Sequence, residues 1–326
     1  MPRVLITGAA GFIGMHTAIR FLKEGWDVIG LDNINNYYSV KLKRKRVENI
    51  KKICSALEPQ FELIERDLNS DIWVQLKSMD ITAVIHLAAQ AGVRYSLENP
   101  GAYITSNILG FQRVLEFVKE TNIRQFIYAS SSSIYGQTAK VPFNEEKEAG
   151  ITPESYYAAT KKANELMAYS YYKTFGVCSI GLRFFTVYGP WGRPDMAPYI
   201  FTNAAFERKS IKVFNHGKQM RDFTYISDIV EGIYNSFLHS VSLEGADYMN
   251  LGNGNPTNLM DFIGSIESIS ENSIEKVFVS SQKGDVSRTF SDNGKAKRLI
   301  GYEPTVTLES GLKLFIEWYK YYHLIK

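Results

Sequence analysis

Tyr157 and Lys161 have a spacing that could turn a tyrosine into a base. Residues four apart share one face of a helix, and a nearby ammonium group favours the phenolate form of the tyrosine. The pair opens a predicted helix just after Thr152-Pro153, where the ends of parallel strands gather at a ligand site. The spacing alone is unspecific, because the chain has 20 tyrosines. It also occurs in three pairs that we interpret as packing or surface pairs: Tyr37/Lys41, Tyr169/Lys173 and Tyr322/Lys326.

A run of four serines, Ser130 to Ser133, follows the predicted strand Gln125–Ala129. Hydroxyl groups at the carboxyl end of a parallel strand point into the same crevice as Tyr157, and one of them could hydrogen-bond a reacting alcohol or ketone. An isolated serine run is usually a polar turn. The Tyr157/Lys161 pair and the glycine pattern described next favour the catalytic interpretation here.

Gly8, Gly11 and Gly14 lie between an apolar run, Arg3–Thr7, and a predicted helix. Glycine at these positions allows a tight turn, a close approach of the backbone to a pyrophosphate, and close packing of the helix on the sheet. Asp32 closes the second predicted strand 18 residues after Gly14, where a carboxylate accepts hydrogen bonds from an adenosine ribose and repels a 2′-phosphate. The pattern therefore predicts an NAD site. A glycine-rich turn without a ligand is the alternative.

A basic segment follows Asp32 and could bind nucleic acid. Its cationic residues are Lys41, Lys43, Arg44, Lys45, Arg46, Lys51 and Lys52. Val40, Val47, Ile50 and Ile53 lie on another side of the same predicted helix. We therefore interpret the basic residues as a solvated face and expect no nucleic-acid partner.

Short apolar runs alternate with longer segments of helical periodicity through the first 185 residues. This βαβ series predicts an α/β fold with a Rossmann-type, doubly wound parallel sheet covered by helices on both faces. The predicted strands are Arg3–Thr7, Asp27–Leu31, Phe61–Glu65, Ala83–Leu87, Gln125–Ala129 and Val177–Phe184. The predicted crossover helices are Phe12–Glu24, Gly101–Thr121 and Tyr156–Phe175.

Glycines and prolines interrupt this rhythm between Gly189 and Pro198, which predicts a loop leaving the sheet. We expect a nucleotide-binding domain over residues 1–186 and a smaller mixed α/β substrate lobe over residues 187–326, with residues 222–250 returning to the first domain. The elements predicted in the lobe are a helix at Tyr199–Arg208, a strand pair of Ile211–Phe214 with Asp222–Tyr225, and helices at Ser227–His239, Asn258–Ile269 and Leu308–Tyr322.

The composition is that of an ordinary globular protein, with 45% hydrophobic and 22% charged residues. A net charge of +3 is too small to indicate a polyanionic partner, and two cysteines, Cys54 and Cys178, cannot form a disulfide framework. The five histidines lack metal-ligand spacing. No run of about 18 apolar residues is present, and the N-terminus shows no cleavage-site pattern. We expect a cytoplasmic protein without a metal and without a membrane partner.

Together these residues resemble the extended short-chain dehydrogenase/reductase family, through Gly8-x-x-Gly11-x-x-Gly14, Ser131 and Tyr157-x-x-x-Lys161. Within that family the chain is most similar to the NAD-dependent nucleotide-sugar epimerases that act at C4 of UDP-glucuronate. The motifs that carry this closer similarity are Asp32-Asn33-x-Asn35-x-Tyr37-Tyr38, Ala91-Gly92-Val93-Arg94-Tyr95-Ser96, Arg183-Phe184-Phe185-Thr186-Val187-Tyr188-Gly189-Pro190, Arg193-Pro194-Asp195-Met196-Ala197 and Arg221-Asp222-Phe223-Thr224-Tyr225.

The resemblance implies a role for each matching residue. Tyr157 would be the base, Lys161 would bind the nicotinamide ribose and lower the pKa of Tyr157, and Ser131 would hold O4 of the sugar. The implied NAD-binding residues are Gly8, Gly11, Phe12, Ile13, Gly14, Asp32, Asn33, Asn35, Asp67, Leu68, Leu87, Ala88, Ala89, Tyr157 and Lys161. For the UDP-sugar, the resemblance implies Arg193, Phe214 and Arg221, and we add Arg94, Ser132, Ser133 and Thr186 as a hypothesis of our own.

The implied reaction is the 4-epimerisation of UDP-glucuronic acid to UDP-galacturonic acid through a 4-keto intermediate. This intermediate is a β-keto acid that readily loses CO₂, so the enzyme must hold the carboxylate firmly. We expect hydrogen bonds from Thr186, Ser132 and Ser133, and positive charge from Arg94 or Arg193. Thr186 replaces the asparagine common in other sugar epimerases, which suits a uronic acid. A structural salt bridge is the alternative interpretation of both arginines.

Other functions share parts of this pattern. The nearest rival is a 4-epimerase of UDP-glucose, of a UDP-N-acetylhexosamine or of the uronic acid of the latter. UDP-glucuronate decarboxylases resemble Tyr-Asp-Glu-Gly-Lys at the helix, whereas this chain has Tyr157-Ala-Ala-Thr-Lys161, and a 4,6-dehydratase needs a carboxylate where Ser132-Ser133 stand. An inert NAD-binding sensor would not need the intact catalytic residues. The resemblance also suggests a homodimer through the Gly101–Thr121 and Tyr156–Phe175 helices.

Overall fold

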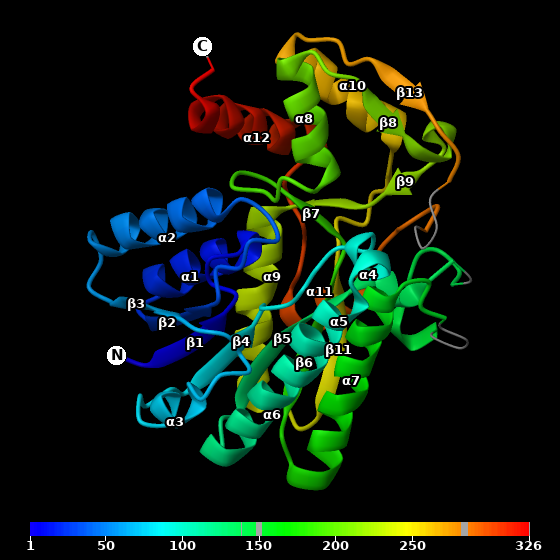
Figure 1. Ribbon diagram of the computed structural model, residues 1–326. Helices are drawn as coiled ribbons and strands as arrows, with labels where there is room; N and C mark the ends of the chain where they lie inside the picture. Colours follow the sequence, from blue (N-terminus) through cyan, green and yellow to red (C-terminus); the bar gives the residue numbers. More distant parts are fainter. Residues whose placement is uncertain (138, 148–151, 282–285, 326) are drawn as a thin grey trace.

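Seven parallel strands form the central sheet of the computed structural model, which describes residues 1–137, 139–147, 152–281 and 286–325 (Figure 1). Their order is β11-β6-β5-β4-β1-β2-β3. The chain order reverses between β1 and β4, which creates a crevice of the kind that binds ligands in open α/β sheets. The predicted doubly wound α/β fold is confirmed. The strands are β1 (Arg3–Thr7), β2 (Asp27–Asp32), β3 (Phe61–Glu65), β4 (Ala83–His86), β5 (Gln125–Ser131), β6 (Ser179–Phe184) and β11 (Ala246–Leu251).

Helices cover both faces of this sheet. One face carries α1 (Phe12–Lys23), α2 (Val40–Cys54) and α9 (Ile226–His239). The other carries α3 (Trp73–Leu76), α6 (Gly110–Thr121) and α7 (Tyr156–Phe175). Side chains alternate along each strand, so Val4 and Ile6 enter the first core while Leu5 enters the second. Such strands form continuous apolar runs in the sequence, which is why their positions are predictable.

The expected helix Gly101–Thr121 is divided into three segments. They are α5 (Pro100–Tyr103), a π-helical segment (Ile104–Leu109) and α6. Asn107 lies in the π-helical segment, where its carbonyl accepts a hydrogen bond from Asn164 of α7 at 2.7 Å. Its side-chain amide donates to the Gln90 carbonyl at 3.0 Å. These contacts hold the segment against α7 and the loop after β4, and π-helical turns are frequent at functional sites.

The second lobe is built from helices and short strand pairs, and Figure 1 shows it above the sheet. Its helices lie near the expected positions: α8 (Ala197–Glu207), α10 (Leu259–Ser270) and α12 (Leu308–His323). Its strand pairs are β7 (Thr186–Tyr188) with β10 (Phe223–Tyr225), β8 (Ile211–Val213) with β13 (Lys276–Phe278), and β9 (Met220–Arg221) with β12 (Thr257–Asn258).

The expected pairing of Ile211–Phe214 with Asp222–Tyr225 is wrong. β8 pairs in parallel with β13, and β10 pairs in parallel with β7. A helical turn, Phe214–Gly217, and strand β9 lie between the two segments, and Asn215 and His216 in the turn adopt left-handed backbone angles that redirect the chain. Both true partners lie far away along the chain, so the local pattern carries no information about them.

Residues 222–250 cross back to the sheet. α9 packs against α1, and β11 pairs in parallel with β6 along its whole length. Phe21 and Phe237 join the two helices, with ring centroids 4.9 Å apart. This arrangement supports the proposed return of the segment to the nucleotide-binding domain, and the domain boundaries stay predictions. A further helix that the sequence did not predict, α11 (Gly294–Ile300), also packs against α9 and β11.

Some other kinds of structure are missing from the part of the chain that the structure describes. None of its helices is both long enough and apolar enough to cross a membrane. In the same ranges, no group of three His, Cys, Asp or Glu side chains is arranged to hold a metal ion.

Candidate active site

A cleft runs between the glycine-rich loop and the second lobe. Thr186 at the start of β7, and Arg193, Arg221 and Thr289 of the second lobe, belong to its lining. Ser131 and every residue that the resemblance assigns to NAD also line the cleft, and their roles stay predictions. Those NAD residues are Gly8, Gly11, Phe12, Ile13, Gly14, Asp32, Asn33, Asn35, Asp67, Leu68, Leu87, Ala88, Ala89, Tyr157 and Lys161.

The glycine-rich loop has no space for side chains at its glycines. A Cβ atom on Gly14 would lie 2.0 Å from the carbonyl oxygen of Gly8, and Gly8 has a φ of +74°. The Gly11 N–H donates to the same carbonyl at 2.9 Å, so the loop makes a tight turn just before α1 begins at Phe12. The first N–H groups of α1 then provide donors for an anion. The loop therefore fits a pyrophosphate.

Asp32 holds the glycine-rich loop against the end of β2. Its carboxylate accepts hydrogen bonds from the backbone N–H groups of Ala10 at 3.0 Å and Ile34 at 2.8 Å. Burial raises the pKa of Asp32, while these N–H groups and the cations Lys43 and Arg46 act in the opposite direction. A carboxylate can accept about four hydrogen bonds, so Asp32 retains acceptor capacity for the hydroxyls of a ribose.

Tyr157 and Lys161 lie in the first two turns of α7 and face the end of β5. The Ser131 hydroxyl lies close enough to the phenol of Tyr157 to act on its pKa as a hydrogen-bond partner. The ammonium group of Lys161, a residue that is 2% exposed, donates to the carbonyl of Ala129 at 2.9 Å. The structure therefore brings the three residues predicted to be catalytic together at one point of the cleft.

Burial has the largest effect on the pKa values of this group. Burial raises the pKa of Tyr157, and the hydrogen bond to Ser131 and the charge of Arg193 oppose that rise. Burial lowers the pKa of Lys161 to about 8. The cation that favours the Tyr157 phenolate here is therefore Arg193, which the resemblance assigns only to the substrate. The effect of Lys161 on Tyr157 stays a prediction.

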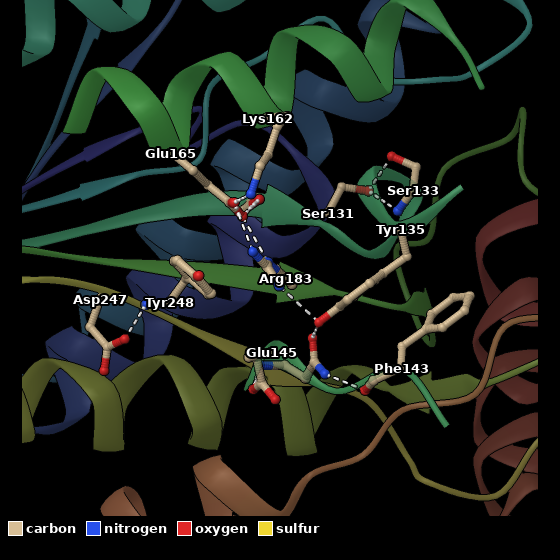
Figure 2. A network of polar contacts seen from close by, with 12 residues as sticks. Ser131, Ser133, Tyr135, Phe143, Glu145, Lys162, Glu165, Arg183, Asp247 and Tyr248 are labelled. Carbon is tan, nitrogen blue, oxygen red and sulfur yellow. Dashed lines mark hydrogen bonds and ion pairs between the residues drawn. The ribbon is translucent and has the colours of Figure 1, made fainter. Parts of the chain in front are cut away.

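A buried polar network continues from α7 to β6 and β11 (Figure 2). Glu165 accepts a hydrogen bond from Ser130 at 2.7 Å and pairs with Arg183 through two hydrogen bonds of 2.8 Å. Arg183, which is completely buried, also donates to the Tyr135 hydroxyl, and Tyr135 donates to Asn250, both at 2.8 Å. The network ties α7 to the sheet. Sequence reasoning missed Glu165, although it lies one helical turn after the predicted lysine on the same face.

The residues predicted to bind the UDP-sugar fall into two groups. Arg94 and Phe214 stack on each other, with the guanidinium carbon 4.7 Å from the ring centroid. Neither belongs to the described residues that line the cleft. Of the two arginines expected to meet a carboxylate, Arg193 is therefore the one that reaches the cleft. The other predicted residues that line it are Ser132, Ser133, Thr186 and Arg221.

Arg193 also has an anionic partner within the protein. Its Nε donates to Asp195 at 3.0 Å, and the hydroxyl of Tyr37 donates to the same carboxylate at 3.1 Å. The structural salt bridge considered as an alternative is thus present in a residue that lines the cleft. Burial and the charge of Asp195 raise the pKa of Tyr37 to about 12, so Tyr37 remains a neutral donor. This contact joins the two sides of the cleft.

Two residues of the basic segment are buried, which corrects the expected solvated face. Lys43 is 5% exposed and Arg46 is 0% exposed. Lys43 lines the cleft and donates to the carbonyl and side-chain oxygens of Asn35 at 2.7 and 2.8 Å, and burial lowers its pKa to about 8. Both cations share a helix face with Val47 and Ile50. That spacing of three, four and seven residues is the signal that could have identified them.

Comparison with known proteins agrees with this geometry. A family model described as GDP-mannose 4,6 dehydratase matches residues 5–315. The chain belongs to this family. The family is a branch of the extended short-chain dehydrogenase/reductase enzymes, so the predicted family is confirmed.

Relatives within this family are similar to the chain over both lobes. UDP-glucuronate 4-epimerase 2 of Arabidopsis thaliana is 41% identical, and the match covers 98% of this chain and 76% of the relative. The solved structure of UDP-glucuronic acid 4-epimerase from Bacillus cereus in complex with UDP-glucuronic acid and NAD is 34% identical, with coverage of 98% and 99% and a TM-score of 0.89. UDP-glucose 4-epimerase from Thermotoga maritima with UDP-glucose is 29% identical, with the same coverage and a TM-score of 0.86.

Proposed function

We propose that this enzyme catalyses the NAD-dependent 4-epimerisation of UDP-glucuronic acid to UDP-galacturonic acid. The observation that carries the proposal is the meeting of Tyr157, Lys161 and Ser131 in one cleft beside the glycine-rich loop. The similar Bacillus cereus structure holds UDP-glucuronic acid and NAD, and the Arabidopsis relative is named for this activity. The chain is therefore assigned as a nucleotide-sugar 4-epimerase.

The residues of the cleft fit NAD. The loop from Gly8 to Gly14 has backbone space and N–H groups for the pyrophosphate, and Asp32 has acceptor capacity for the adenosine ribose. Its negative charge disfavours a 2′-phosphate. Lys161 would hold the nicotinamide ribose. When bound, NAD⁺ supplies a reversible hydride acceptor for C4, so that the sugar passes through a 4-keto form without net oxidation.

Tyr157 would remove the proton of the C4 hydroxyl and later return it. Burial raises the pKa of Tyr157, and the interaction with Ser131 and the charge of Arg193 oppose that rise in favour of the phenolate. Ser131 accepts hydrogen bonds from the N–H and the hydroxyl of Ser133, at 3.2 and 2.9 Å. The single proton of the Ser131 hydroxyl can therefore be donated to the Tyr157 oxygen or to O4 of the sugar.

The carboxylate of the substrate must be held because the 4-keto form of a uronic acid is a β-keto acid. Ser132, Ser133 and Thr186 line the cleft and would donate hydrogen bonds to it. Arg193 would add positive charge. The bonds from Arg193 to Asp195 use Nε and Nη2, and within the described residues Nη1 makes none, so this edge of the guanidinium can face the sugar. Fixing the carboxylate prevents its C–C bond from aligning with the ketone.

Proton NMR of UDP-glucuronate incubated with the purified enzyme tests this proposal. We expect UDP-galacturonate to accumulate with no added oxidant, because the hydride returns to the same sugar. A UDP-pentose formed with release of CO₂ as the main product would refute the proposal. No turnover in enzyme that has bound NAD would refute it as well.

A 4-epimerase of neutral UDP-sugars is the second candidate, because the Thermotoga maritima enzyme of this kind shares the fold. Parallel assays with UDP-glucose separate the two. We expect kcat/KM for UDP-glucuronate to be at least about tenfold higher than for UDP-glucose, since a neutral sugar has no carboxylate for Arg193 to contact. The family model is described as a dehydratase, but Ser132 and Ser133 provide no carboxylate for an elimination.

We also propose that two copies form a homodimer through α5 to α7. Large apolar side chains are exposed on the π-helical segment and on α7, which contact each other. They are Ile104, Leu109, Leu166 and Tyr169, with exposed fractions of 39% to 61%. Covering them in a dimer would remove apolar surface from water. A cytoplasmic location stays a prediction.

A further inference from the structure

Arg46 joins three segments that lie far apart in the sequence. Its Nη1 donates to the Ala10 carbonyl at 3.2 Å and to the Tyr38 hydroxyl at 2.6 Å. Its Nε and Nη2 donate to the Trp191 carbonyl at 3.0 and 2.6 Å, and Nη2 also donates to the Gly192 carbonyl at 3.2 Å. The side chain is completely buried. One residue of α2 therefore contacts both the glycine-rich loop and the loop between β7 and α8.

The loop between β7 and α8 is directed toward the nucleotide-binding side, and in Figure 1 it lies between α2 and α12. The nucleotide-binding side donates hydrogen bonds to three consecutive carbonyls of this loop. His16 Nε2 donates to the Pro190 carbonyl at 3.0 Å, and Arg46 donates to the next two carbonyls. Trp191 has a φ of +66°, a strained angle for a bulky residue. Its ring packs against Trp318 of α12 at 5.5 Å. The strained loop is thus held from both sides.

The oxygens that Arg46 contacts are neutral. They are backbone carbonyls and a phenol, and no carboxylate of the described residues forms an ion pair with it. Burying a guanidinium without an anionic contact is costly. Asp32 interacts with both Lys43 and Arg46, which leaves an excess of positive charge beside the glycine-rich loop. The pyrophosphate of a dinucleotide on this loop would balance that charge.

We propose that Arg46 is a positioning residue that couples the binding of the dinucleotide to the placement of Arg193. The inference rests on the proposed function for the identity of the two ligands. By holding the Ala10 carbonyl, Arg46 fixes the loop that receives the pyrophosphate. By holding the Trp191 and Gly192 carbonyls, it fixes the start of the segment that carries Arg193 into the cleft. The hydrogen bonds of Arg46 therefore fix the positions of the two ligand sites relative to each other.

Arg46→Met tests the proposal, because it keeps an apolar stem and removes all five hydrogen bonds. The readouts are the NAD content of the purified protein, the Kd for NAD, and the Kd for UDP-glucuronate and UDP measured by calorimetry at saturating NAD. We expect NAD to bind about tenfold more weakly and UDP-glucuronate about fivefold more weakly. An unchanged Kd for either NAD or UDP-glucuronate would overturn the coupling.

Arg44→Met is the matched control on the same helix. Arg44 is exposed and pairs with Glu65 at 2.9 Å, so its removal should leave both affinities within about twofold of the wild type. An equal loss in this control would assign the effect of Arg46→Met to the stability of α2 and refute the proposal.

Arg46→Lys is the variant that tests the coupling if Arg46→Met does not fold. An ammonium group keeps the attraction for a pyrophosphate, but it cannot reproduce the planar fork that spans both loops. NAD affinity should return to within about threefold of the wild type, while UDP-glucuronate binding stays weakened. Recovery of both affinities would overturn the proposal. Wild-type enzyme that binds both ligands without epimerising the sugar would refute the proposed function and leave the coupling intact.

Discussion

The hydroxyl of Ser130 donates to the carboxylate of Glu165 at 2.7 Å, one helical turn beyond Lys161. Ser130 directly precedes Ser131, so this contact fixes the position of α7, which carries Tyr157 and Lys161, along β5, which carries Ser131. Arg183 pairs with Glu165 through two hydrogen bonds of 2.8 Å, and Lys162 donates to the same carboxylate at 3.1 Å. The network therefore holds α7 in a fixed position against β5 and β6.

Ser130→Ala should slow the reaction without weakening substrate binding. Without the hydroxyl, α7 loses one of its attachments to β5, and a small displacement of a proton-transfer group costs rate rather than affinity. We expect kcat to fall about tenfold, with KM for UDP-glucuronate within about twofold of the wild type. Initial rates measure both, and Ser170→Ala on the exposed side of α7 is the matched control. A kcat equal to that of the control would show that this contact does not set the geometry.

Tyr157→Phe should abolish epimerisation and leave NAD in place. The change removes only the hydroxyl that accepts the substrate proton, and we expect kcat to fall by about a thousandfold or more. Tyr169→Phe is the matched control, because Tyr169 has the same spacing to a lysine on the same helix but is 52% exposed. Rates and bound NAD are measured on both variants. A similar loss in both, or retained activity in Tyr157→Phe, would contradict the role of Tyr157.

The strands and the glycine-rich loop could be predicted because their information is local. β1 begins and ends where its apolar run predicts, since a strand buried on both faces forms an uninterrupted apolar run in the sequence. β3, at the edge of the sheet, also has the predicted bounds, although Glu62 and Glu65 are exposed. The start of α7 is equally local, because the hydroxyl of Ser155 accepts the N–H of Ala158 at 3.1 Å and caps the helix. The family resemblance then supplied the residues of the cleft that lie between these elements.

The features that could not be predicted depend on contacts between distant segments. A lysine or arginine next to apolar residues on a helix has the same sequence pattern whether its side chain is exposed to solvent or buried. Arg46 is buried because the Trp191 carbonyl, 145 residues away, accepts its protons. β8 likewise takes as its partner β13, which pairs Lys276 with Ile211 across a long stretch of sequence. Arg94 has the motif position of a ligand-binding residue, and only the tertiary structure places it on Phe214.

His86 should make the folded state less stable in mild acid. The Thr7 hydroxyl lies 2.8 Å from His86 Nδ1 and accepts the Ala88 N–H at 3.2 Å, so we assign its own proton to the bond with Nδ1. Burial and the charge of Lys161 lower the pKa of His86 from 6.5 to about 3. Between these values the unfolded chain binds a proton that the folded chain does not. The contribution of His86 to stability is therefore complete above pH 6.5 and declines as the pH falls.

His86→Gln measures this contribution. Urea unfolding at about pH 7.5 and about pH 5 gives the free energy of unfolding of the wild type and the variant. The wild type should lose about 2 kcal/mol more than the variant between these two pH values, because pH 5 lies about 1.5 units below the ordinary histidine pKa. Equal losses in both proteins would show that His86 titrates normally in the folded state.

Arg193→Met should impair turnover of UDP-glucuronate far more than the retention of NAD. The change removes one of the cations that line the cleft, and with it the positive charge that favours the Tyr157 phenolate. We expect kcat/KM to fall about a hundredfold, with NAD content within about twofold of the wild type. Arg94→Met is the control, since Arg94 stacks on Phe214 outside the lining of the cleft. A greater loss in Arg94→Met would transfer the carboxylate contact to Arg94.

Leu166→Glu combined with Ile104→Glu should convert a dimer into monomers. Leu166 is 61% and Ile104 is 39% exposed, and a carboxylate at each position would have to be buried in an interface formed by α7 and the π-helical segment. Size-exclusion chromatography with light scattering measures the mass, and we expect dimer for the wild type and monomer for the variant. Val74→Glu on α3, where Val74 is 77% exposed, is the control that should stay dimeric. In a symmetric dimer each introduced carboxylate would lie close to its copy in the partner, and such buried like charges repel. A dimer that survives both substitutions would therefore place the interface elsewhere, and a monomeric wild type would refute the proposed dimer.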